Sequence, residues 1–400
     1  MTWKATRESA LERFHTFLPS AGSSYAAGRN YVFQPPTAQA VSGLSPYITR
    51  RILTEEEVFS AVVKTHGFHP ASKFLQEVAW RTYWKGWLYL RPDVWTRYRS
   101  DLDTLRSEDT PQPWVTAYTQ ALDGDTGIDC FDCWARELTD TGYLHNHTRM
   151  WFASIWVFTL RLPWQLGADF FYQHLLDADA ASNTLSWRWV AGLHTPGKHY
   201  VATAENIQRY TQGRFNPAGL LNEKPEPLAG SPPAPCRPFA PPAGITQTNP
   251  SHSIWLVTQE DLHGDNLVTY PPEGARMALL QPDPDEPTSC RVQRFEEAAA
   301  ADLSERVNDL HPNLTLETFP LSKDTALTLR SENIHEVHVM DPGIGYRSDF
   351  LNSLSDTLSA HQITLVRHMR DWDRQLYPHA TKGYFHFRKQ LPSLASTYLD

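Results

Sequence analysis

Five polar residues in the middle of the chain have the types and spacing needed to line a pocket for a large polar ring system. Asn146 and Arg149 lie three positions apart in a predicted helix, so their side chains share one face. Asp177, Asp179 and Asn183 follow within one short polar segment. Together they provide a cation, two carboxylates and two amides beside an apolar helix. Helix capping and surface ion pairing are the alternative interpretation, which spacing alone leaves open.

Two other segments are expected to position these residues. A predicted helix over residues 71–90 puts Glu77, Trp80 and Arg81 within about one turn of each other. A Glu side chain buried beside a Trp requires a polar partner. Residues 42–47, SGLSPY, are rich in hydroxyl groups, as a turn that contacts phosphate before a helix would be. Because Ser also caps helices, capping is an open interpretation of this segment as well.

Composition indicates a folded chain of two or three domains, with 400 residues, 41% apolar and 20% charged. The longest apolar run, residues 150–160, is too short to span a bilayer, and no charged-then-apolar leader opens the chain. A cytoplasmic protein is therefore expected. Residues 1–240 hold 23 basic and 23 acidic residues, whereas residues 241–400 hold 13 and 22. This balance does not indicate the basic patch typical of a duplex-DNA binder.

The chain changes character after residue 222. Residues 225–250 contain nine prolines, which predicts an extended, semi-rigid linker. Beyond it, strand and helix patterns alternate, which predicts a parallel sheet with helices on both faces. We therefore expect a helical domain at 1–222, a linker at 223–250 and an α/β domain at 251–400. The strand candidates are SIWLVT, ARMALLQ, LTLETF, HEVHVM and ITLVRH.

The four cysteines are too few for a disulfide scaffold. Cys130 and Cys133 form a CxxC pair, which can bind metal or do redox chemistry. Since no second pair or ligand cluster accompanies them, core cysteines are favoured. The His145–His147 segment lacks the four-residue spacing of helical metal ligands. No metal site is predicted.

The order of the motifs resembles the photolyase/cryptochrome family. TGYLHNHTRM, then LLDADAASN and WRW, are similar to its FAD-binding domain, and the resemblance covers most of residues 22–220. IWLVTQEDLHGDN, HEVHVMDPG, ITLVRHMRDWDRQL and TKGYFHFRKQLP resemble its antenna domain. The implied fold is an α-helical FAD-binding domain followed by a Rossmann-like α/β domain with a parallel sheet. Because the antenna domain normally comes first, the chain resembles a circularly permuted member.

The resemblance implies a bound FAD and leaves any antenna chromophore unspecified. Asn183 matches the position that faces flavin N5, and Arg149 with Asp177 would pair beside the ring. Val41 stands where a Thr is common, which removes one hydrogen bond worth roughly 0.5–1.5 kcal/mol. The matched cofactor positions are Tyr25, Ser42, Leu44, Ser45, Arg81, Asn146, Arg149, Asp177, Asp179 and Asn183.

Other matched positions imply repair of DNA. Glu77, Trp80, Met150 and Trp189 match the cavity that receives a flipped pyrimidine dimer, where reduced flavin donates an electron under blue light. Core packing is the alternative for the two tryptophans. Arg29, Tyr143 and His147 stand at positions expected near DNA. Tyr143 replaces a usual Trp, and His147 replaces an Arg that often contacts DNA. Both departures weaken the interpretation as a repair enzyme.

Two further tryptophans match the chain that delivers electrons to the flavin in this family. Trp187 and Trp164 match its first two members. The third position falls at Ala121, so Tyr118 or Trp114 would have to take its place, or the chain is shorter. Ordinary core packing is the competing interpretation for both.

Three functions follow from these matches. The first is an enzyme, a deoxyribodipyrimidine photolyase-like carbon–carbon lyase whose partner is DNA with pyrimidine dimers. The second is a cryptochrome-type photoreceptor that signals to a protein partner through flavin photoreduction. The third is a flavin-binding scaffold. Glu77, Trp80 and Met150 favour the enzyme, which we prefer, whereas the charge balance, Tyr143 and His147 favour the photoreceptor. Neither a membrane nor a metal is an expected partner.

Overall fold

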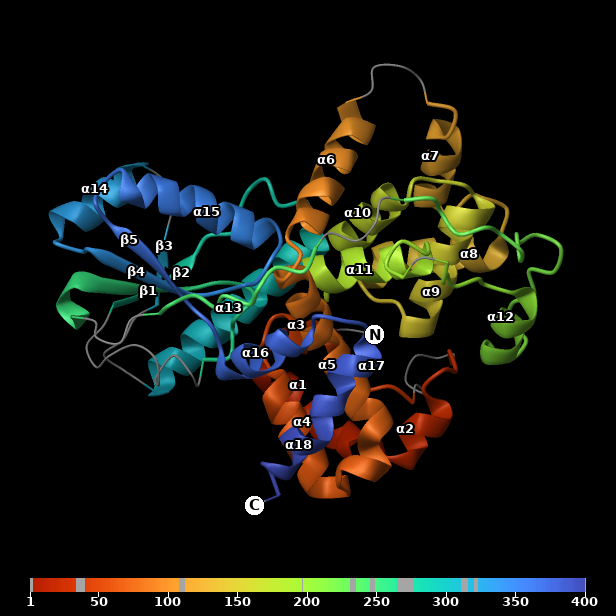
Figure 1. Cartoon of the computed structure of the whole chain (residues 1–400), viewed down its shortest axis with the longest axis horizontal. Coiled ribbons are helices and arrows are strands. Elements are labelled where there is room, and N and C mark those ends of the chain that lie inside the picture. The colour runs from red at the N-terminus through yellow and green to blue at the C-terminus, as the bar shows by residue number, and fades with distance from the viewer. Residues whose placement is uncertain are drawn as a thin grey trace.

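The computed structural model describes residues 3–33, 40–107, 112–195, 197–230, 235–244, 249–264, 276–310, 316–319 and 323–399. The first part of the chain is helical (Figure 1). Its helices are α1 (Arg7–Phe17), α2 (Ser23–Gly28), α3 (Ser45–Thr49), α4 (Glu55–His66), α5 (Phe68–Tyr89), α6 (Asp93–Ser107), α7 (Val115–Asp123), α8 (Asp129–Thr141), α9 (Asn146–Ser154), α10 (Trp164–His174), α11 (Ala180–Val190) and α12 (Ala204–Tyr210). A π-helical segment, Ile155–Thr159, extends α9.

Side-chain caps set the starts of the helices that matter for the site. Thr54 and Glu57 form a capping box that begins α4. The ring of His145 caps α9, since its Nδ1 accepts a hydrogen bond from the backbone of His147. Asp179 caps α11 by accepting from the backbone of Ser182. These caps fix where α9 and α11 begin, and so where their exposed N–H groups point.

The second part contains a five-stranded, wholly parallel sheet with strand order β3-β2-β1-β4-β5. This confirms the predicted fold class, a helical region followed by a parallel α/β region. The elements are β1 (Ser253–Val257), β2 (Arg276–Leu280), β3 (Glu317–Phe319), β4 (Glu336–Met340) and β5 (Thr364–His368), with α13 (Cys290–Leu310), α14 (Lys323–Ser331) and α15 (Tyr346–Ser359).

The two faces of the sheet belong to different cores. Ile254 and Leu256 of β1 pack in a core shared with α14 and α15. Trp255 and Val257, which point to the opposite face, pack with α13 in the core that continues into the helical part. Figure 1 shows α15 and α13 on opposite sides of the strands. Because successive side chains of β1 point to opposite faces, this strand belongs to both cores and so links the two parts of the chain.

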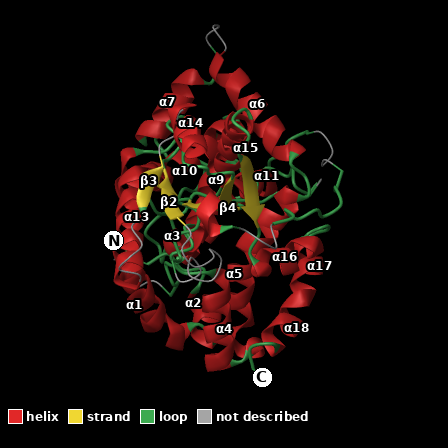
Figure 2. Ribbon diagram, turned by 90° about the vertical axis from the view of Figure 1, so that its left-hand side faces the viewer, coloured by secondary structure: helices red, strands yellow, loops and turns green. Residues whose placement is uncertain are grey.

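After β5 the chain returns to the helical part. Three short helices, α16 (Asp371–Leu376), α17 (Tyr384–Phe387) and α18 (Leu391–Ser396), pack against α5 and α4. In both views α18 lies beside α4 (Figure 1, Figure 2). The hydroxyl of Tyr384 donates to the Gln76 carbonyl of α5 at 2.6 Å. The end of the sequence thus covers a face of a helix from its beginning.

Buried ion pairs hold the two parts together. Arg50 in the helical part pairs with Glu296 of α13 at 2.8 Å, and Arg51 pairs with Asp373 of α16 at 2.5 Å. Lys85 of α5 pairs with Glu260 in the loop after β1 at 3.1 Å. Removing one partner of such a pair leaves an uncompensated buried charge, which is costly.

The described residues of the proline-rich segment lie along the helical part. The backbone N–H of Arg237 donates to the Leu90 carbonyl at 2.9 Å, and the Tyr89 hydroxyl donates to the Ala240 carbonyl at 3.1 Å. The domain boundaries given above stay a prediction. Among the helices described, none combines the length and apolar character needed to cross a membrane.

Candidate functional site

Asp179 is the centre of a buried group of charges where α5 and α11 meet. Its carboxylate lies 3.1 Å from the Lys85 ammonium and 3.6 Å from the Arg81 guanidinium, and its side chain is 2% exposed. Burial acts to raise the pKa of Asp179, but Lys85 and Arg81 outweigh it and hold this pKa well below its usual value. Asp179 is therefore ionised at neutral pH.

Arg81 ties two further elements to this group. Its guanidinium pairs with Glu55 at the start of α4 and donates to the Thr49 carbonyl of α3 at 3.2 Å. Arg149 of α9 pairs with Asp177 at 2.8 Å, as the resemblance implies. We name Arg81, Lys85, Arg149, Asp177 and Asp179 the polar cluster. It is held by α5, α9 and α11, which are far apart in sequence.

Several buried polar atoms around the polar cluster have no hydrogen-bond partner among the described residues. They are His145 Nε2, Thr148 Oγ1, Asp177 Oδ1 and Ser182 Oγ. Leaving one such atom unsatisfied costs about 1–3 kcal/mol, so several together indicate a polar ligand. The exposed N–H groups at the starts of α9 and α11 favour anionic groups such as a diphosphate. The residues present therefore fit FAD.

The protonation state of His145 follows from its contacts. Burial, followed by the charges of His147 and Arg149, lowers the pKa of His145 to about 3. The neutral ring accepts from the His147 backbone through Nδ1 at 3.1 Å, so its proton sits on Nε2. His145 thus offers a donor beside the polar cluster. The sequence prediction did not include it, although its place immediately before Asn146 was a signal.

The remaining predicted cofactor residues each have contacts of their own, outside the polar cluster. Asn183 donates from Nδ2 to the Ala168 carbonyl at 2.7 Å, and Asn146 is exposed at the first position of α9. Ser42 accepts from the backbone of Leu44 at 3.3 Å, just before α3, which begins at Ser45. Tyr25 is buried, with its ring against Phe74. The structure thus brings Arg81, Arg149, Asp177 and Asp179 together, while these residues lie around them.

The residues predicted to meet a flipped base are engaged within the fold. Glu77 pairs with Arg29, and burial raises the pKa of Glu77 against the effect of that cation. The ring of Trp80 stacks on Tyr384 with centroids 3.6 Å apart and planes 10° apart. Met150 is half-buried, and Trp189 stacks on Tyr200 at 5.8 Å. One face of Trp80 is therefore covered by α17.

The other two residues expected near DNA also face protein. His147 is 7% exposed, stacks on Trp151 at 4.2 Å and makes a 3.0 Å hydrogen bond with the Asn30 carbonyl. Tyr143 packs on Trp3 at 5.1 Å, and Arg149 lies over its ring. In this structure neither side chain is free to contact a phosphate backbone.

The two predicted electron-transfer residues have different neighbours. Trp187 is buried, with Phe171 at 5.0 Å and Trp156 at 6.1 Å between ring centroids. Trp164 stacks on Tyr98 at 5.5 Å. Sequence reasoning missed Trp156, since no motif marks it. It also missed Lys85, although the four-residue spacing from Arg81 puts both cations on one face of α5.

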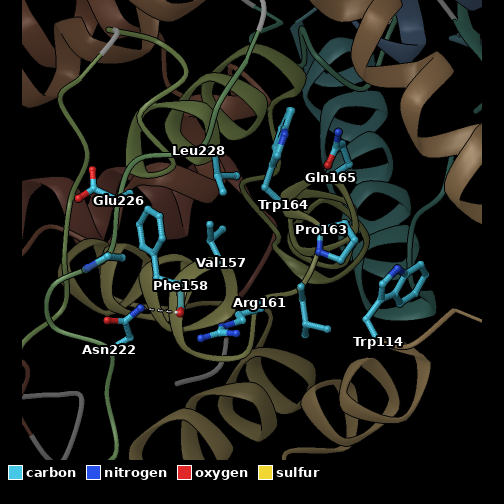
Figure 3. Close-up of a pocket in the computed structure, with 12 residues that line it drawn as sticks. Trp114, Val157, Phe158, Arg161, Pro163, Trp164, Gln165, Asn222, Glu226 and Leu228 are labelled. Atoms are coloured by element: carbon cyan, nitrogen blue, oxygen red, sulfur yellow. Dashed lines mark hydrogen bonds between the residues drawn. The ribbon is translucent and has the colours of Figure 1, made fainter.

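Two cavities open elsewhere on the described part of the chain. One, of about 500 Å³, lies between the end of the π-helical segment, the start of α10 and residues 222–228 (Figure 3). Trp114, Arg161 and Trp164 are among its lining residues. The other, of about 590 Å³, lies between α6 and α15 and is lined by Trp95, Arg99 and Tyr346 among others. Within the same described residues, no group of three His, Cys, Asp or Glu side chains could hold a metal ion.

Comparison with known proteins supports the resemblance seen in the sequence. Residues 74–219 match the model of the FAD binding domain of DNA photolyase. The chain is 31% identical over 222 residues to a deoxyribodipyrimidine photo-lyase of a Synechococcus species, covering 50% of this chain and 44% of that protein. It is 29% identical over 205 residues to one from Alkalihalophilus pseudofirmus, covering 50% and 40%. These matches support the resemblance of the chain to the photolyase/cryptochrome family.

The matched model is that of a FAD-binding domain, so FAD is the cofactor of this chain. The matched stretch contains the whole polar cluster, Asn183 and Trp187, whereas Tyr25 and the turn at residues 42–45 precede it. A class III photolyase structure from Agrobacterium tumefaciens overlaps 51% of this chain and 42% of its own, at 24% identity and a TM-score of 0.43. The chain spans only about two fifths of the length of the two curated relatives. Activity and substrate are therefore a matter of proposal.

Proposed function

We propose that this protein is a light-driven photolyase that splits pyrimidine dimers in DNA. The observation that carries the proposal is the position of Glu77 and Trp80 on α5, immediately before Arg81, which contacts Asp179 in the polar cluster. A carboxyl group and an indole beside the flavin are the groups needed to hold a flipped dimer against it. The two relatives named above carry the name deoxyribodipyrimidine photo-lyase, which supports the same substrate.

When bound, reduced FAD supplies the light-absorbing electron donor for cleavage of the dimer. The chain's own residues bind and orient. Arg149 and His145 offer a cation and an N–H donor beside the ring system, while Lys85 and Arg81 keep Asp179 ionised. These groups are held by buried pairs, so they need little rearrangement when charge develops nearby.

Glu77 has the properties of a hydrogen-bond donor to a pyrimidine carbonyl. Burial raises its pKa, which increases the fraction of the protonated form that can donate. In the structure it pairs with Arg29, so a dimer has to displace this cation or share the carboxyl group with it. Trp80 has to exchange its stack on Tyr384 for a stack on a base. The proposal therefore requires local movement of α17.

The experiment is illumination of the full chain, with its flavin chemically reduced, in the presence of dimer-containing single-stranded and duplex DNA at one stated low salt concentration. Wild-type protein should restore the pyrimidines. Glu77→Gln should lower the yield per photon several-fold with FAD content unchanged. The matched control is Asp103→Asn, an amide for a carboxylate at an exposed position of α6, which should repair normally. Light-independent loss of dimers, or no loss at all, would contradict the proposal.

A second function is favoured by one observation. Tyr384 covers Trp80 and Arg29 occupies Glu77, so the face that would receive a lesion is closed in this structure. A cryptochrome-type photoreceptor, which needs flavin photoreduction but no lesion site, is compatible with that closure. Wild-type protein that photoreduces its flavin yet binds neither damaged single strands nor damaged duplexes at low salt would support it.

A further inference from the structure

A continuous line of aromatic rings leads from Trp187 to the protein surface. Ring centroids are 6.1 Å apart between Trp187 and Trp156, 5.9 Å between Trp156 and Tyr118, and 5.9 Å between Tyr118 and Trp114. Trp187 and Trp156 are buried, whereas Tyr118 and Trp114 are half-buried. Trp114 lines the cavity of about 500 Å³ shown in Figure 3. The line therefore runs from the helix that carries the flavin residues to an open cavity.

The contact between the two inner indoles depends on a glycine. A Cβ atom at Gly167 of α10 would lie 2.3 Å from the Trp187 ring and 2.9 Å from the Trp156 ring. Gly inside a helix costs about 0.5–1 kcal/mol relative to Ala, which here is offset by the close approach of both indoles. Trp156 is also fixed by its Nε1, which donates to the Pro163 carbonyl at 3.0 Å, and it lies in the π-helical segment. Such segments often occur at functional sites.

Tyr118 differs from the other three rings because its oxidation releases a proton. Burial, followed by the charge of Asp169, raises the pKa of the Tyr118 phenol. Tyr118 is therefore a neutral phenol that has to release its proton when it is oxidised.

We propose that electrons reach the flavin through Trp156 and Tyr118, with the cavity at Trp114 as the place where an external reductant approaches. The proposal rests on the FAD-dependent function above and goes beyond it. Trp187 gives one electron to the light-excited oxidised flavin, Trp156 refills Trp187, and Tyr118 refills Trp156. Tyr118, which is half-buried, loses one proton to water and becomes a neutral tyrosyl radical. A small one-electron reductant, such as a thiol, then returns an electron to Tyr118, which regains its proton.

This route replaces the predicted step through Trp164. Trp164 stacks on Tyr98 and lines the same cavity as Trp114. Among the ring pairs of the described residues, Trp164 is not paired with Trp187. Ala121, at the expected third position, is buried and carries no ring. Trp134→Phe is the matched control for Trp156→Phe, because Trp134 is a buried indole that belongs neither to the line of rings nor to the lining of the cavity.

The experiment uses the full chain loaded with oxidised FAD and an external thiol. We measure the photoreduction rate, the radical species by electron paramagnetic resonance, the FAD content and the melting temperature. Wild type should give a tyrosyl radical. Trp156→Phe should slow photoreduction at least tenfold and remove that radical, with FAD retained, whereas Trp134→Phe should keep most of the rate. Tyr118→Phe, at a half-buried position, should fold normally and lose the tyrosyl signal.

Two results would overturn the route. One is an unchanged rate in folded, FAD-loaded Trp156→Phe. The other is a wild-type radical that persists in Tyr118→Phe. Dimer repair by chemically reduced protein needs no relay, so it should be unaffected by either variant. A protein that photoreduces through this route but repairs nothing would reject the proposed repair function and leave the relay standing.

Discussion

Trp187 and Trp80 stand on α11 and α5, the two helices that bring Asp179 and Arg81 into contact, yet their surroundings are opposite. The rings around Trp187 continue outward through Trp156 to a cavity. The ring of Trp80 is closed off by Tyr384, which comes from the other end of the chain. The same residue type thus contacts a line of rings on one side and is covered by a single ring on the other. Environment, rather than residue type, separates electron supply from recognition.

The largest expected effect concerns Trp187, whose neighbouring rings lead to a cavity. Trp187→Phe should nearly abolish photoreduction, because the first ring of the relay is lost, while the polar cluster that holds FAD is untouched. Photoreduction rate, FAD content and thermal stability should be measured together. Loss of stability without loss of rate would show that Trp187 only fills the core, where replacing a large aromatic costs packing energy.

The polar cluster that the two sides share should be sensitive to loss of one charge. Asp179→Asn keeps a good helix cap but removes the partner of Lys85 and Arg81. Breaking a buried pair costs about 3–5 kcal/mol, and we expect the lower end because Glu260 and Glu55 still pair with these cations. Urea unfolding of the FAD-free protein measures this loss of free energy of unfolding, with the exposed Asp103→Asn as control. Equal stability of the two variants would contradict the assignment of Asp179 as a structural centre.

His145 should make the stability of the FAD-free protein depend on pH. The unfolded His takes a proton near pH 6.5, whereas the folded residue does so only near its pKa of about 3. Stability is therefore lost as the pH falls below 6.5, by about 2 kcal/mol on reaching pH 5. His145→Asn, which also caps a helix but does not titrate, should show a correspondingly shallower dependence. Parallel curves for the two proteins would mean that the pKa of His145 is the same in the folded and the unfolded state.

The smallest effect should appear on the covered side. Tyr384→Ala uncovers Trp80, and since an aromatic pair contributes about 0.5–1.5 kcal/mol beyond its buried area, dimer-containing single strands should bind about two- to tenfold tighter. Phe385→Ala, at the 73% exposed neighbouring position, is the control and should leave affinity unchanged. Binding must be compared at one salt concentration. Weaker binding after Tyr384→Ala would show that Tyr384 itself forms part of the DNA site.

Local sequence patterns were enough to predict the fold class, but not the different surroundings of Trp187 and Trp80. The alternation of strand and helix segments predicted a parallel sheet, and the structure confirms it, with SIWLVT and HEVHVM as β1 and β4. The Arg149–Asp177 pair was implied by the motif and is present. The stack of Tyr384 on Trp80 joins residues about three hundred positions apart, which periodicity cannot reveal. Trp156 lies in a uniformly apolar run, where a conducting ring and a packing ring have the same pattern.

The most direct test of the account is the flavin content of the reconstituted chain. The full-length protein should be incubated with FAD, separated from free cofactor, and then denatured to release and quantify what it holds. The account predicts stoichiometric, noncovalent FAD in wild type and a large loss in Arg149→Ala, which removes the cation beside Asp177. A well-folded wild-type protein that retains no flavin would contradict the site and every function derived from it.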